Sequence, residues 1–264
     1  MNTAFRTWKT VLVSCVGAGC ATWGCTQLPA ETHPSSLSQA RLQQLVERDT
    51  SGYELAAPRD PNGIGKYYMG RQIAHVMGHE GAEWLERHGR RQEEGTDLLL
   101  NELQLKPTDV VADIGAGTGF FTFQLARKVP KGQVLAVDIQ PEMLAAINEN
   151  KVRRKISNVV PVLGTTTDPH LPADSLDLVL IVDAYHEFDH PREMARAIRK
   201  ALRPGTGRLA LVEYRAEDVN VPIKRIHKMS VEQAQKEMAA AGLELVQTVG
   251  TLPQQHLLLF KRKE

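Results

Sequence analysis

From residue 96 onward, apolar and polar positions fall into two alternating kinds of segment. Short apolar runs are typical of buried strands, and the longer segments between them carry apolar residues at helical spacing. The expected strands are residues 110–113, 133–138, 159–163, 174–182, 208–214, 243–248 and 256–262. The expected helices are residues 96–105, 120–127, 141–150, 192–202 and 230–241. Strands that alternate with helices predict an α/β fold with a mostly parallel, doubly wound sheet.

The first expected strand ends in a glycine-rich turn. Asp113 closes the apolar run, and Gly115, Gly117 and Gly119 follow at alternate positions. Glycines let ligand atoms approach the backbone, and the N–H groups that open a helix donate hydrogen bonds. A dinucleotide fingerprint would need its third glycine at Phe120. The spacing therefore favours a cofactor with one nucleoside and no pyrophosphate; a turn without a ligand is the alternative.

A second acidic residue follows the second expected strand. Asp138 ends that strand about 25 residues after Asp113, the separation typical of nucleotide-binding α/β folds. A carboxylate there accepts hydrogen bonds from both ribose hydroxyls. Pro141 suits the first turn of the helix that follows.

With these motifs in register, residues 98–263 resemble the class I S-adenosylmethionine-dependent methyltransferases, nearest the quinone- and arsenite-methylating branch. The resemblance implies S-adenosyl-L-methionine as cofactor, a small-molecule methyl acceptor, and a seven-stranded sheet closed by an antiparallel hairpin. No Asn-Pro-Pro-Tyr or Asp-Pro-Pro-Tyr motif follows the fourth strand, which argues against methylation of nucleic-acid bases. The expected cofactor-binding residues are Asp113, Gly115, Ala116, Gly117, Gly119, Asp138, Ile139, Met143, Thr166 and Asp183.

The fourth expected strand runs into a polar cluster. In a doubly wound sheet, ligands bind beyond the carboxyl ends of the strands, near the point where the strand order reverses. Strand four adjoins strand one there, so Tyr185, His186 and Glu187 are expected to face the transferable methyl group. His186 or Glu187 is expected to remove the acceptor's proton, and Tyr185 to shape the pocket. Tyr214, at the end of the fifth strand, is expected to reach the substrate.

One position departs from the family. An acidic residue usually lies near the adenine in the loop after the third strand, and Thr165 stands there instead. Asp168 is the candidate to replace it. His227 and His256 are candidates to line the pocket, but a surface or sheet-edge position is favoured for each.

Residues 61–95 are interpreted as a helical lid over the cofactor. Apolar residues between Ile73 and Leu85 form a helical stripe, interrupted by glycines. The residues of this lid that are expected to touch ligand are Tyr67, Tyr68, Arg71 and His75. His75 and His79 have the i,i+4 spacing of two metal ligands, but neither a cysteine nor an HExxH pattern joins them, so no metal site is predicted.

Residues 1–26 have the pattern of a signal or lipoprotein signal: a basic start, a short apolar region and small residues. Cys20 and Cys25 each follow a glycine and are candidates for lipidation, which would attach the protein to a membrane. Residues 27–60 are expected as a polar linker with a short helix. These features predict a periplasmic or cell-envelope protein, in conflict with a cofactor made in the cytoplasm. A frayed tail or mis-assigned start, with a cytoplasmic location, is the alternative.

Composition narrows the function classes. The net charge is +1 and aromatic residues make up 5%, so neither charge nor stacking favours a nucleic-acid partner. The three cysteines are Cys15, Cys20 and Cys25, so the domain has no disulfide framework and no cysteine nucleophile. The oligomeric state is left open.

Two classes of function remain. The first is methyl transfer to a small molecule by in-line displacement, with most of the acceleration coming from alignment in a closed site. The second is an exported binding or scaffold protein that keeps the fold without turnover. An oxidoreductase is disfavoured by the glycine spacing.

Overall fold

The computed structural model describes residues 52–264. The predicted signal at residues 1–26, with its two candidate cysteines, and the short helix predicted in the linker lie outside the described residues. No helix within the described part is long and apolar enough to cross a bilayer.

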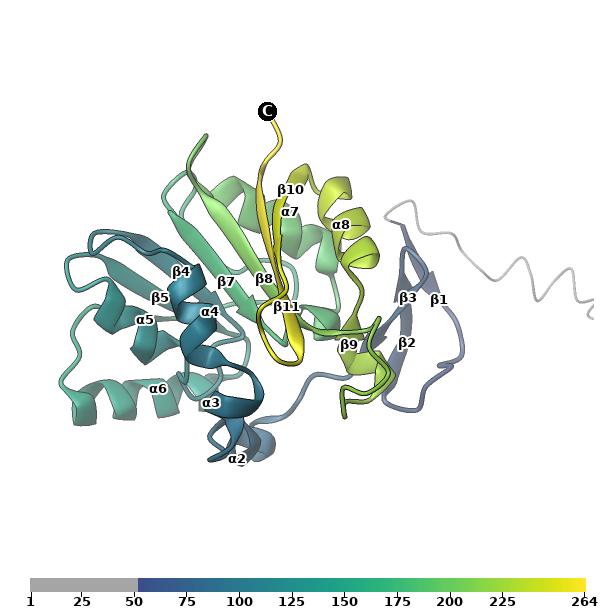
Figure 1. Ribbon diagram of the computed structural model, residues 1–264, viewed down its shortest axis with the longest axis horizontal. Helices are drawn as coiled ribbons and strands as arrows, with labels where there is room; N and C mark the ends of the chain where they lie inside the picture. The colour runs from purple at the N-terminus through teal and green to yellow at the C-terminus, as the bar shows by residue number, and fades with distance from the viewer. Residues whose placement is uncertain (1–51) are drawn as a thin grey trace, which may run out of the picture. The chain divides into compact units, whose positions relative to one another are not determined.

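A large sheet forms the centre of the domain (Figure 1), with the strand order β10-β11-β8-β7-β4-β5-β6. Strands β4 to β8 run parallel, whereas β10 and β11 form an antiparallel hairpin against β8. The strands are β4 (Val110–Ile114), β5 (Gln133–Asp138), β6 (Val159–Leu163), β7 (Leu178–Val182), β8 (Arg208–Arg215), β10 (Leu243–Val249) and β11 (Gln255–Arg262). The short strand β9 (Lys228–Met229) adds to β8. The predicted doubly wound, seven-stranded sheet with its closing hairpin is confirmed.

Helices cover both faces of this sheet. One core joins α4, α5 and α6 to the sheet, and a second joins α7 and α8 to the opposite face. The helices are α4 (Thr96–Glu102), α5 (Thr122–Lys128), α6 (Pro141–Arg154), α7 (Pro191–Ala201) and α8 (Val231–Ala240). Pro141 and Pro191 open their helices, and the Ser230 side chain accepts a hydrogen bond from the Gln233 N–H at the start of α8.

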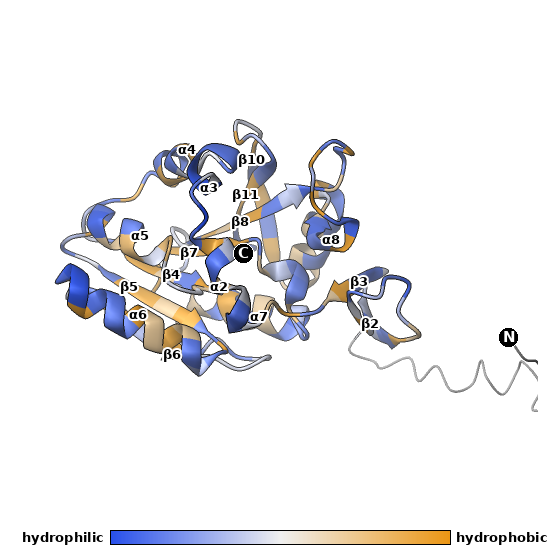
Figure 2. Ribbon diagram, turned by 90° about the horizontal axis from the view of Figure 1, so that it is seen from below, coloured by the Kyte–Doolittle hydropathy of each residue, from blue (hydrophilic) through white to orange (hydrophobic). Residues whose placement is uncertain are grey.

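The central strands are apolar on both sides because both sides are covered. In β7, Leu178 and Leu180 belong to one core, and Val179 and Ile181 belong to the other. Figure 2 shows the hydrophobic residues concentrated in the strands of the large sheet. Continuous apolar runs of this kind are expected for strands buried on both faces.

Residues 53–74 are not helical, so the helical-lid prediction is wrong for this stretch. They form a separate antiparallel sheet of β1 (Tyr53–Leu55), β2 (Gly63–Tyr68) and β3 (Arg71–Ala74). Met69 and Gly70 both have positive φ and turn the chain between β2 and β3. Tyr68 and Ile73 lie on the two arms of this hairpin and pack in one small core. The apolar spacing that suggested a helix therefore comes partly from a hairpin.

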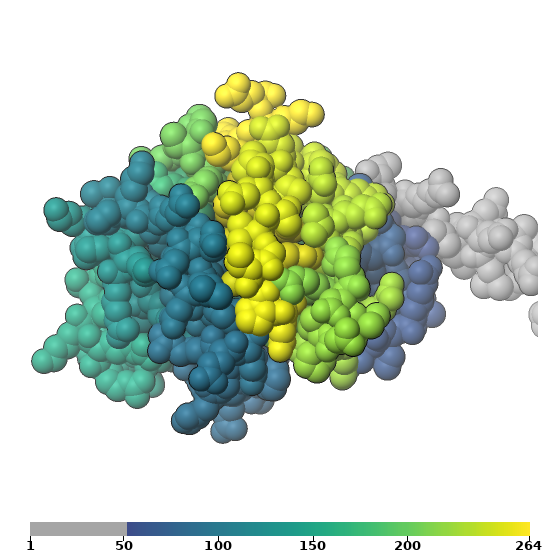
Figure 3. Space-filling view, in the orientation of Figure 1, coloured from purple at the N-terminus to yellow at the C-terminus, as the bar shows by residue number. Residues whose placement is uncertain are grey.

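The rest of the lid is made of short pieces. These are a 3₁₀ turn η1 (His79–Gly81) and the one-turn helices α2 (Ala82–Leu85) and α3 (Arg90–Glu93). Figure 3 shows the blue segment that contains them against the yellow C-terminal hairpin. Gly95 lies close to Pro253 at this contact. Residues 76–94, which we call the lid from here on, therefore keep a covering position with little helix.

Candidate active site

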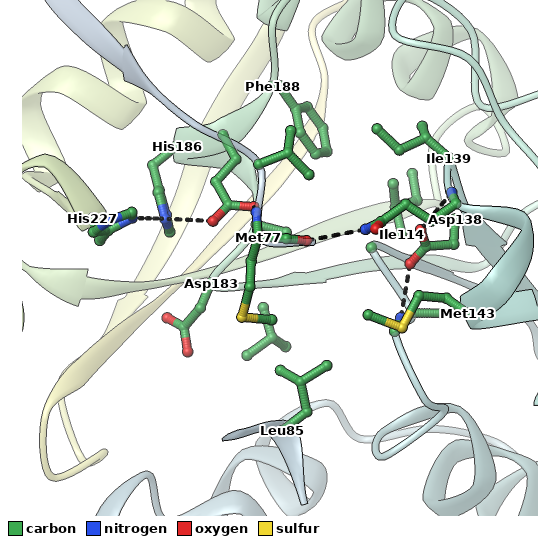
Figure 4. Close-up of a pocket in the computed structure, with 18 of the residues that line it drawn as sticks. Met77, Leu85, Ile114, Asp138, Ile139, Met143, Asp183, His186, Phe188 and His227 are labelled. Atoms are coloured by element: carbon green, nitrogen blue, oxygen red, sulfur yellow. Dashed lines mark hydrogen bonds and ion pairs between the residues drawn. The ribbon is translucent and has the colours of Figure 1, made fainter. Parts of the chain in front are cut away.

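A pocket of about 470 Å³ opens at the carboxyl ends of β4, β5 and β7, and the lid forms one wall. This volume lies within the range of small-molecule sites. The lid contributes Val76, Met77, Trp84 and Leu85 to the lining. Figure 4 shows Asp138, Ile139 and Met143 at one end of the pocket and His186 with His227 at the other. We call these the cofactor end and the acceptor end.

At the cofactor end, two glycines leave room that a side chain would fill. Gly115 and Gly117 line the pocket with positive φ values of 74° and 55°. A Cβ at Gly115 would lie 2.8 Å from the Cβ of Ala184, and one at Gly117 would lie 2.6 Å from Cδ1 of Leu85. Gly119 differs: it does not line the pocket, and a Cβ there would meet the Phe123 ring inside the domain.

Asp138 lies beside this glycine turn. One carboxylate oxygen accepts a hydrogen bond from the Gly117 N–H at 2.9 Å, and the other accepts from the Gln140 N–H at 3.0 Å. Burial raises the pKa of this carboxyl. A carboxylate has about four lone-pair directions, so two remain for ribose hydroxyls. Ile139 and Met143 line the same end.

Asp113 sits under the turn and also lines the pocket. It accepts a hydrogen bond of 2.6 Å from the Thr122 hydroxyl. Burial raises its pKa to about 6, against the opposing influence of Thr122 and Arg90. The buried Asp113 carboxyl therefore titrates close to neutral pH, and it lies beside the space where a cationic ligand would bind.

In the loop after β6, the predicted position of Thr166 at the pocket agrees with the structure, and that of Asp168 does not. Thr165 and Thr166 both line the pocket, and Ala116 does so from the glycine turn. Asp168 does not line it: its carboxylate is exposed and accepts a hydrogen bond from the His170 N–H. Asp168 therefore does not take the place of the missing acidic residue.

Asp183, just after β7, has a positive φ of 49° and lines the pocket. One of its oxygens accepts a hydrogen bond of 2.6 Å from the Gln255 amide, and the other is buried without a partner among residues 52–264. Burial and the carboxylates of Glu94 and Glu213 raise its pKa well above the usual value. A buried acceptor without a donor fits the amino group of a methionine moiety.

The acceptor end is a network of side chains. His186, on the 3₁₀ turn η2 (Tyr185–Glu187), has Nδ1 2.7 Å from Oε2 of Glu213. Its Nε2 lies 3.1 Å from Nδ1 of His227 and 3.7 Å from Oε1 of Glu187. His227 comes from η3 (Arg225–His227) and lines the pocket, which was the less favoured of the two positions expected for it. His256 is buried and does not line the pocket.

The neighbouring charges set the pKa values of this network. Burial opposes the charge of His186, but the Glu213 carboxylate outweighs it and raises the pKa of the imidazole. Burial raises the pKa of Glu187. Burial, with His186 and Lys224 nearby, lowers the pKa of His227.

The lid is tied to both sides of the pocket through one residue. The Met77 N–H donates to Oε2 of Glu187 at 3.2 Å, and the Met77 carbonyl accepts from the Gln140 side chain at 3.1 Å. Figure 4 shows Met77 between the two ends. Farther along the lid, Glu94 accepts a hydrogen bond from the Tyr214 hydroxyl. Tyr214 lines the pocket, as predicted for a substrate residue.

Five residues predicted to touch ligand do not line the pocket: Tyr67, Tyr68, Arg71, His75 and Tyr185. The two adjacent tyrosines belong to the small sheet, and His75 is exposed. Arg71 is paired with Glu237 and donates to the His186 carbonyl, so it supports the acceptor end from behind. Tyr185 is fully buried between Phe188 and the Arg71 guanidinium.

The sequence placed Glu213 at the pocket end of its strand and offered His227 as a possible lining residue, but it gave neither residue a functional role. Glu213 lies near the end of an apolar strand, and His227 lies 41 residues beyond His186. A charged residue in a strand that is otherwise buried was the available signal for Glu213. The local pattern around His227 does not show that it reaches His186.

Comparisons with known proteins support this geometry. Residues 111–207 match the family model described as a methyltransferase domain. An uncharacterised methyltransferase-like protein of Schizosaccharomyces pombe is 34% identical over 135 residues, which are 51% of this chain and 49% of that protein. The chain spans about half or less of the length of the first curated relatives it matches.

Two solved structures share the fold. An S-adenosylmethionine-dependent methyltransferase from Aquifex aeolicus has a TM-score of 0.66 at 21% identity, and covers 70% of this chain and 98% of that one. An O-methyltransferase of neocarzinostatin biosynthesis, in complex with S-adenosyl-L-homocysteine and 1,4-dihydroxy-2-naphthoic acid, has a TM-score of 0.57 at 17% identity, and covers 69% of this chain and 56% of that one.

The residues present fit the cofactor. The glycine turn lines the pocket with backbone at two positions where a Cβ would clash with Ala184 or Leu85, Asp138 keeps free lone pairs, and Asp183 keeps an unpartnered oxygen. Together with the strand order and the matched family model, these features confirm the prediction made from the glycine motif. Residues 111–207 carry a methyltransferase domain, in a fold that this chain shares with S-adenosylmethionine-dependent methyltransferases.

Proposed function

We propose that this protein transfers the methyl group of S-adenosylmethionine to a small-molecule acceptor by in-line displacement. The observation that carries the proposal is the two-ended pocket, with a backbone cradle and Asp138 at one end and His186, Glu187 and His227 at the other. A pocket volume of about 470 Å³ suits a small acceptor rather than a macromolecule.

The chain's own residues bind, orient and exclude water. The bound cofactor would supply an electrophilic methyl group on sulfur. Asp138 and the glycine turn hold the nucleoside, and Asp183 accepts from the amino group. His186 and Glu187 are placed to assist departure of the acceptor's proton. Most of the acceleration comes from alignment beneath the lid that Met77 ties down on both sides.

The acceptor class follows from the acceptor end. Proton-accepting groups are useful when the nucleophilic atom carries a proton, as a phenol, alcohol or thiol does. The O-methyltransferase of neocarzinostatin biosynthesis, a fold relative, was solved in complex with a hydroxyl-bearing small molecule, 1,4-dihydroxy-2-naphthoic acid. A hydroxyl- or thiol-bearing small molecule is therefore the proposed substrate class.

Calorimetry of the full chain with S-adenosylmethionine, S-adenosylhomocysteine and NAD tests the cofactor assignment. The proposal predicts one-to-one binding of the first two and none of NAD. Methyl-labelled cofactor, incubated with small phenols and thiols, then tests turnover. Tight cofactor binding without any transfer would favour the binding or scaffold protein, and absence of cofactor binding would overturn both.

We also propose that the protein works in the cell envelope, with Cys20 and Cys25 as the candidates for a lipid anchor, on the pattern of residues 1–26. Expressed in a Gram-negative host with its own start, it should fractionate with the envelope. Lipid labelling that disappears in Cys20→Ser or Cys25→Ser would identify the anchor. Full-length protein found only in the cytosol would contradict the location.

A further inference from the structure

Three potential metal ligands converge at the acceptor end. Nε2 of His186, Nδ1 of His227 and a carboxylate oxygen of Glu187 all lie within 4.8 Å of one another. The two ring nitrogens are 3.1 Å apart, and Glu187 Oε1 is 3.7 Å from His186 Nε2. Atoms bound to one ion at about 2.1 Å are about 3.0–3.4 Å apart in octahedral or tetrahedral geometry. The ligand atoms therefore stand close to the separations that a shared ion requires.

The surroundings orient these atoms. A carboxylate only accepts hydrogen bonds, so His186 Nδ1 carries the proton that is donated to Glu213, and Nε2 faces His227. A histidine whose other nitrogen donates to a carboxylate is the usual arrangement in metal sites. Glu187 is oriented too: Met77 N–H bonds Oε2, and Oε1 faces His186.

The charges are complementary to a dication. Glu187 and Glu213 bring two carboxylates to the cluster, and both are at least largely buried. The cationic side chains next to them are bonded elsewhere, Arg71 to Glu237 and Lys224 to Asn62. Nε2 of His186 and Nδ1 of His227 are in hydrogen-bond contact, so one of the two nitrogens must carry a proton. An ion bound by both nitrogens would replace this hydrogen bond.

We propose that His186, Glu187 and His227 bind a divalent transition-metal ion of the Zn²⁺ class at the acceptor end of the pocket. Two imidazoles and one carboxylate, with a position left open, form the ligand set of catalytic zinc sites. Glu213 is a positioning residue that fixes His186. The sequence did not predict this metal site because the ligands of the ion come from two separate segments, η2 and η3.

The role of the ion rests on the proposed function. With the ion bound, His186 and Glu187 would serve as its ligands and not as the base. The acceptor's hydroxyl or thiol would take the open position, and the ion would lower its pKa so that its proton leaves to water. The acceptor's lone pair then forms the bond to the methyl carbon, while the electron pair of the carbon–sulfur bond stays on the departing sulfur. Binding of the ion itself requires neither the cofactor nor the acceptor.

Metal binding is tested on the full chain after treatment with a chelator. Titration with Zn²⁺ by calorimetry should show one ion for each chain, and Co²⁺ should give visible absorption bands that Zn²⁺ abolishes. His227→Ala should weaken Zn²⁺ binding by about 100-fold or more, and Glu213→Gln by about 10- to 100-fold. His88→Gln, which changes an exposed histidine of the lid, is the matched control and should bind Zn²⁺ as the wild type does.

The results separate this proposal from the proposed function. No retained Zn²⁺, or equal affinity in wild type and His227→Ala, would overturn the metal site even if S-adenosylmethionine binds normally; the cluster would then act as a metal-free base. Zn²⁺ binding without S-adenosylmethionine binding would overturn the proposed function and leave the site standing. His227 is only partly buried, so its replacement keeps the test valid if variants of the buried His186 do not fold.

Discussion

The two ends of the pocket are built from different parts of the chain. The cofactor end is mostly backbone: two glycines that leave space and N–H groups that hold the Asp138 carboxylate. The acceptor end is a set of side chains on η2, η3 and β8, held together by contacts among His186, His227 and Glu213. Backbone defines a shape, whereas this side-chain network supplies lone pairs and charge.

This difference predicts two separable kinds of defect. Changes at the cofactor end should weaken binding of the nucleoside. Changes at the acceptor end should slow transfer while the cofactor still binds. Met77 is bonded to both ends, through its carbonyl to Gln140 and its N–H to Glu187.

The largest effect is expected for Gly117→Val. The new side chain would start 2.6 Å from Leu85 Cδ1, inside the pocket, at a φ of 55° that valine rarely adopts. We expect cofactor binding to fall below detection by calorimetry while the domain remains folded by circular dichroism. Normal binding by this variant would place the cofactor elsewhere.

At the acceptor end, Glu187→Gln should slow methyl transfer by about 10²- to 10⁴-fold and leave the cofactor affinity within about threefold of the wild-type value. The amide keeps the shape and can still accept from Met77, but it loses the charge. Single-turnover rates and calorimetry measure the two effects. Glu193→Gln is the control, because Glu193 bonds Tyr53 outside the pocket.

If the methyl-transfer rate of Glu187→Gln falls by less than tenfold, transfer depends on alignment alone or on an acceptor that is already ionised. Loss of cofactor binding in this variant would mean that the two ends are not separable.

A smaller loss is expected for Asp138→Ala. Removing the acceptor of the ribose hydroxyls should weaken cofactor binding by about 1–3 kcal/mol. Asp168→Ala is the matched control, since its exposed carboxylate lies outside the pocket lining and should not affect affinity. Equal affinities of wild type and Asp138→Ala would remove Asp138 from the site.

The smallest effect concerns pH and Asp113. Its pKa is raised by burial to about 6 in the folded protein, so it binds a proton more readily there than in the unfolded chain. The stability it contributes is full below the unfolded-state pKa and is lost as the pH rises through about 6. Without cofactor, wild type should therefore gain about 1 kcal/mol over Asp113→Asn between pH 8 and pH 5, in denaturant titrations. An unchanged difference between the two proteins would contradict the raised pKa.

The comparison also explains which parts could be predicted from the sequence. Gly115, Gly117 and Asp138 follow directly on strands, so local pattern was enough to place them. His227 and Glu213 reach His186 only through the tertiary fold, because β8 lies beside β7 and η3 comes after it. No short-range sequence pattern predicts that these residues come into contact with His186.

The prediction of a helical lid failed for a related reason. It rested on the apolar stripe between Ile73 and Leu85, but apolar spacing over a short segment does not distinguish a helix from a tight hairpin. Pairing of β2 with β3 turned Tyr68 and Ile73 into a separate core, and the ligand-facing role fell to Val76, Met77 and Leu85.

A crystal structure of the protein with S-adenosylhomocysteine and Zn²⁺ tests the two-ended pocket most directly. The account predicts ribose hydroxyls at about 3 Å from the Asp138 carboxylate. It also predicts that the sulfur points toward an ion held by His186, Glu187 and His227. A nucleoside bound away from Asp138, or a sulfur that faces away from these three residues, would contradict it.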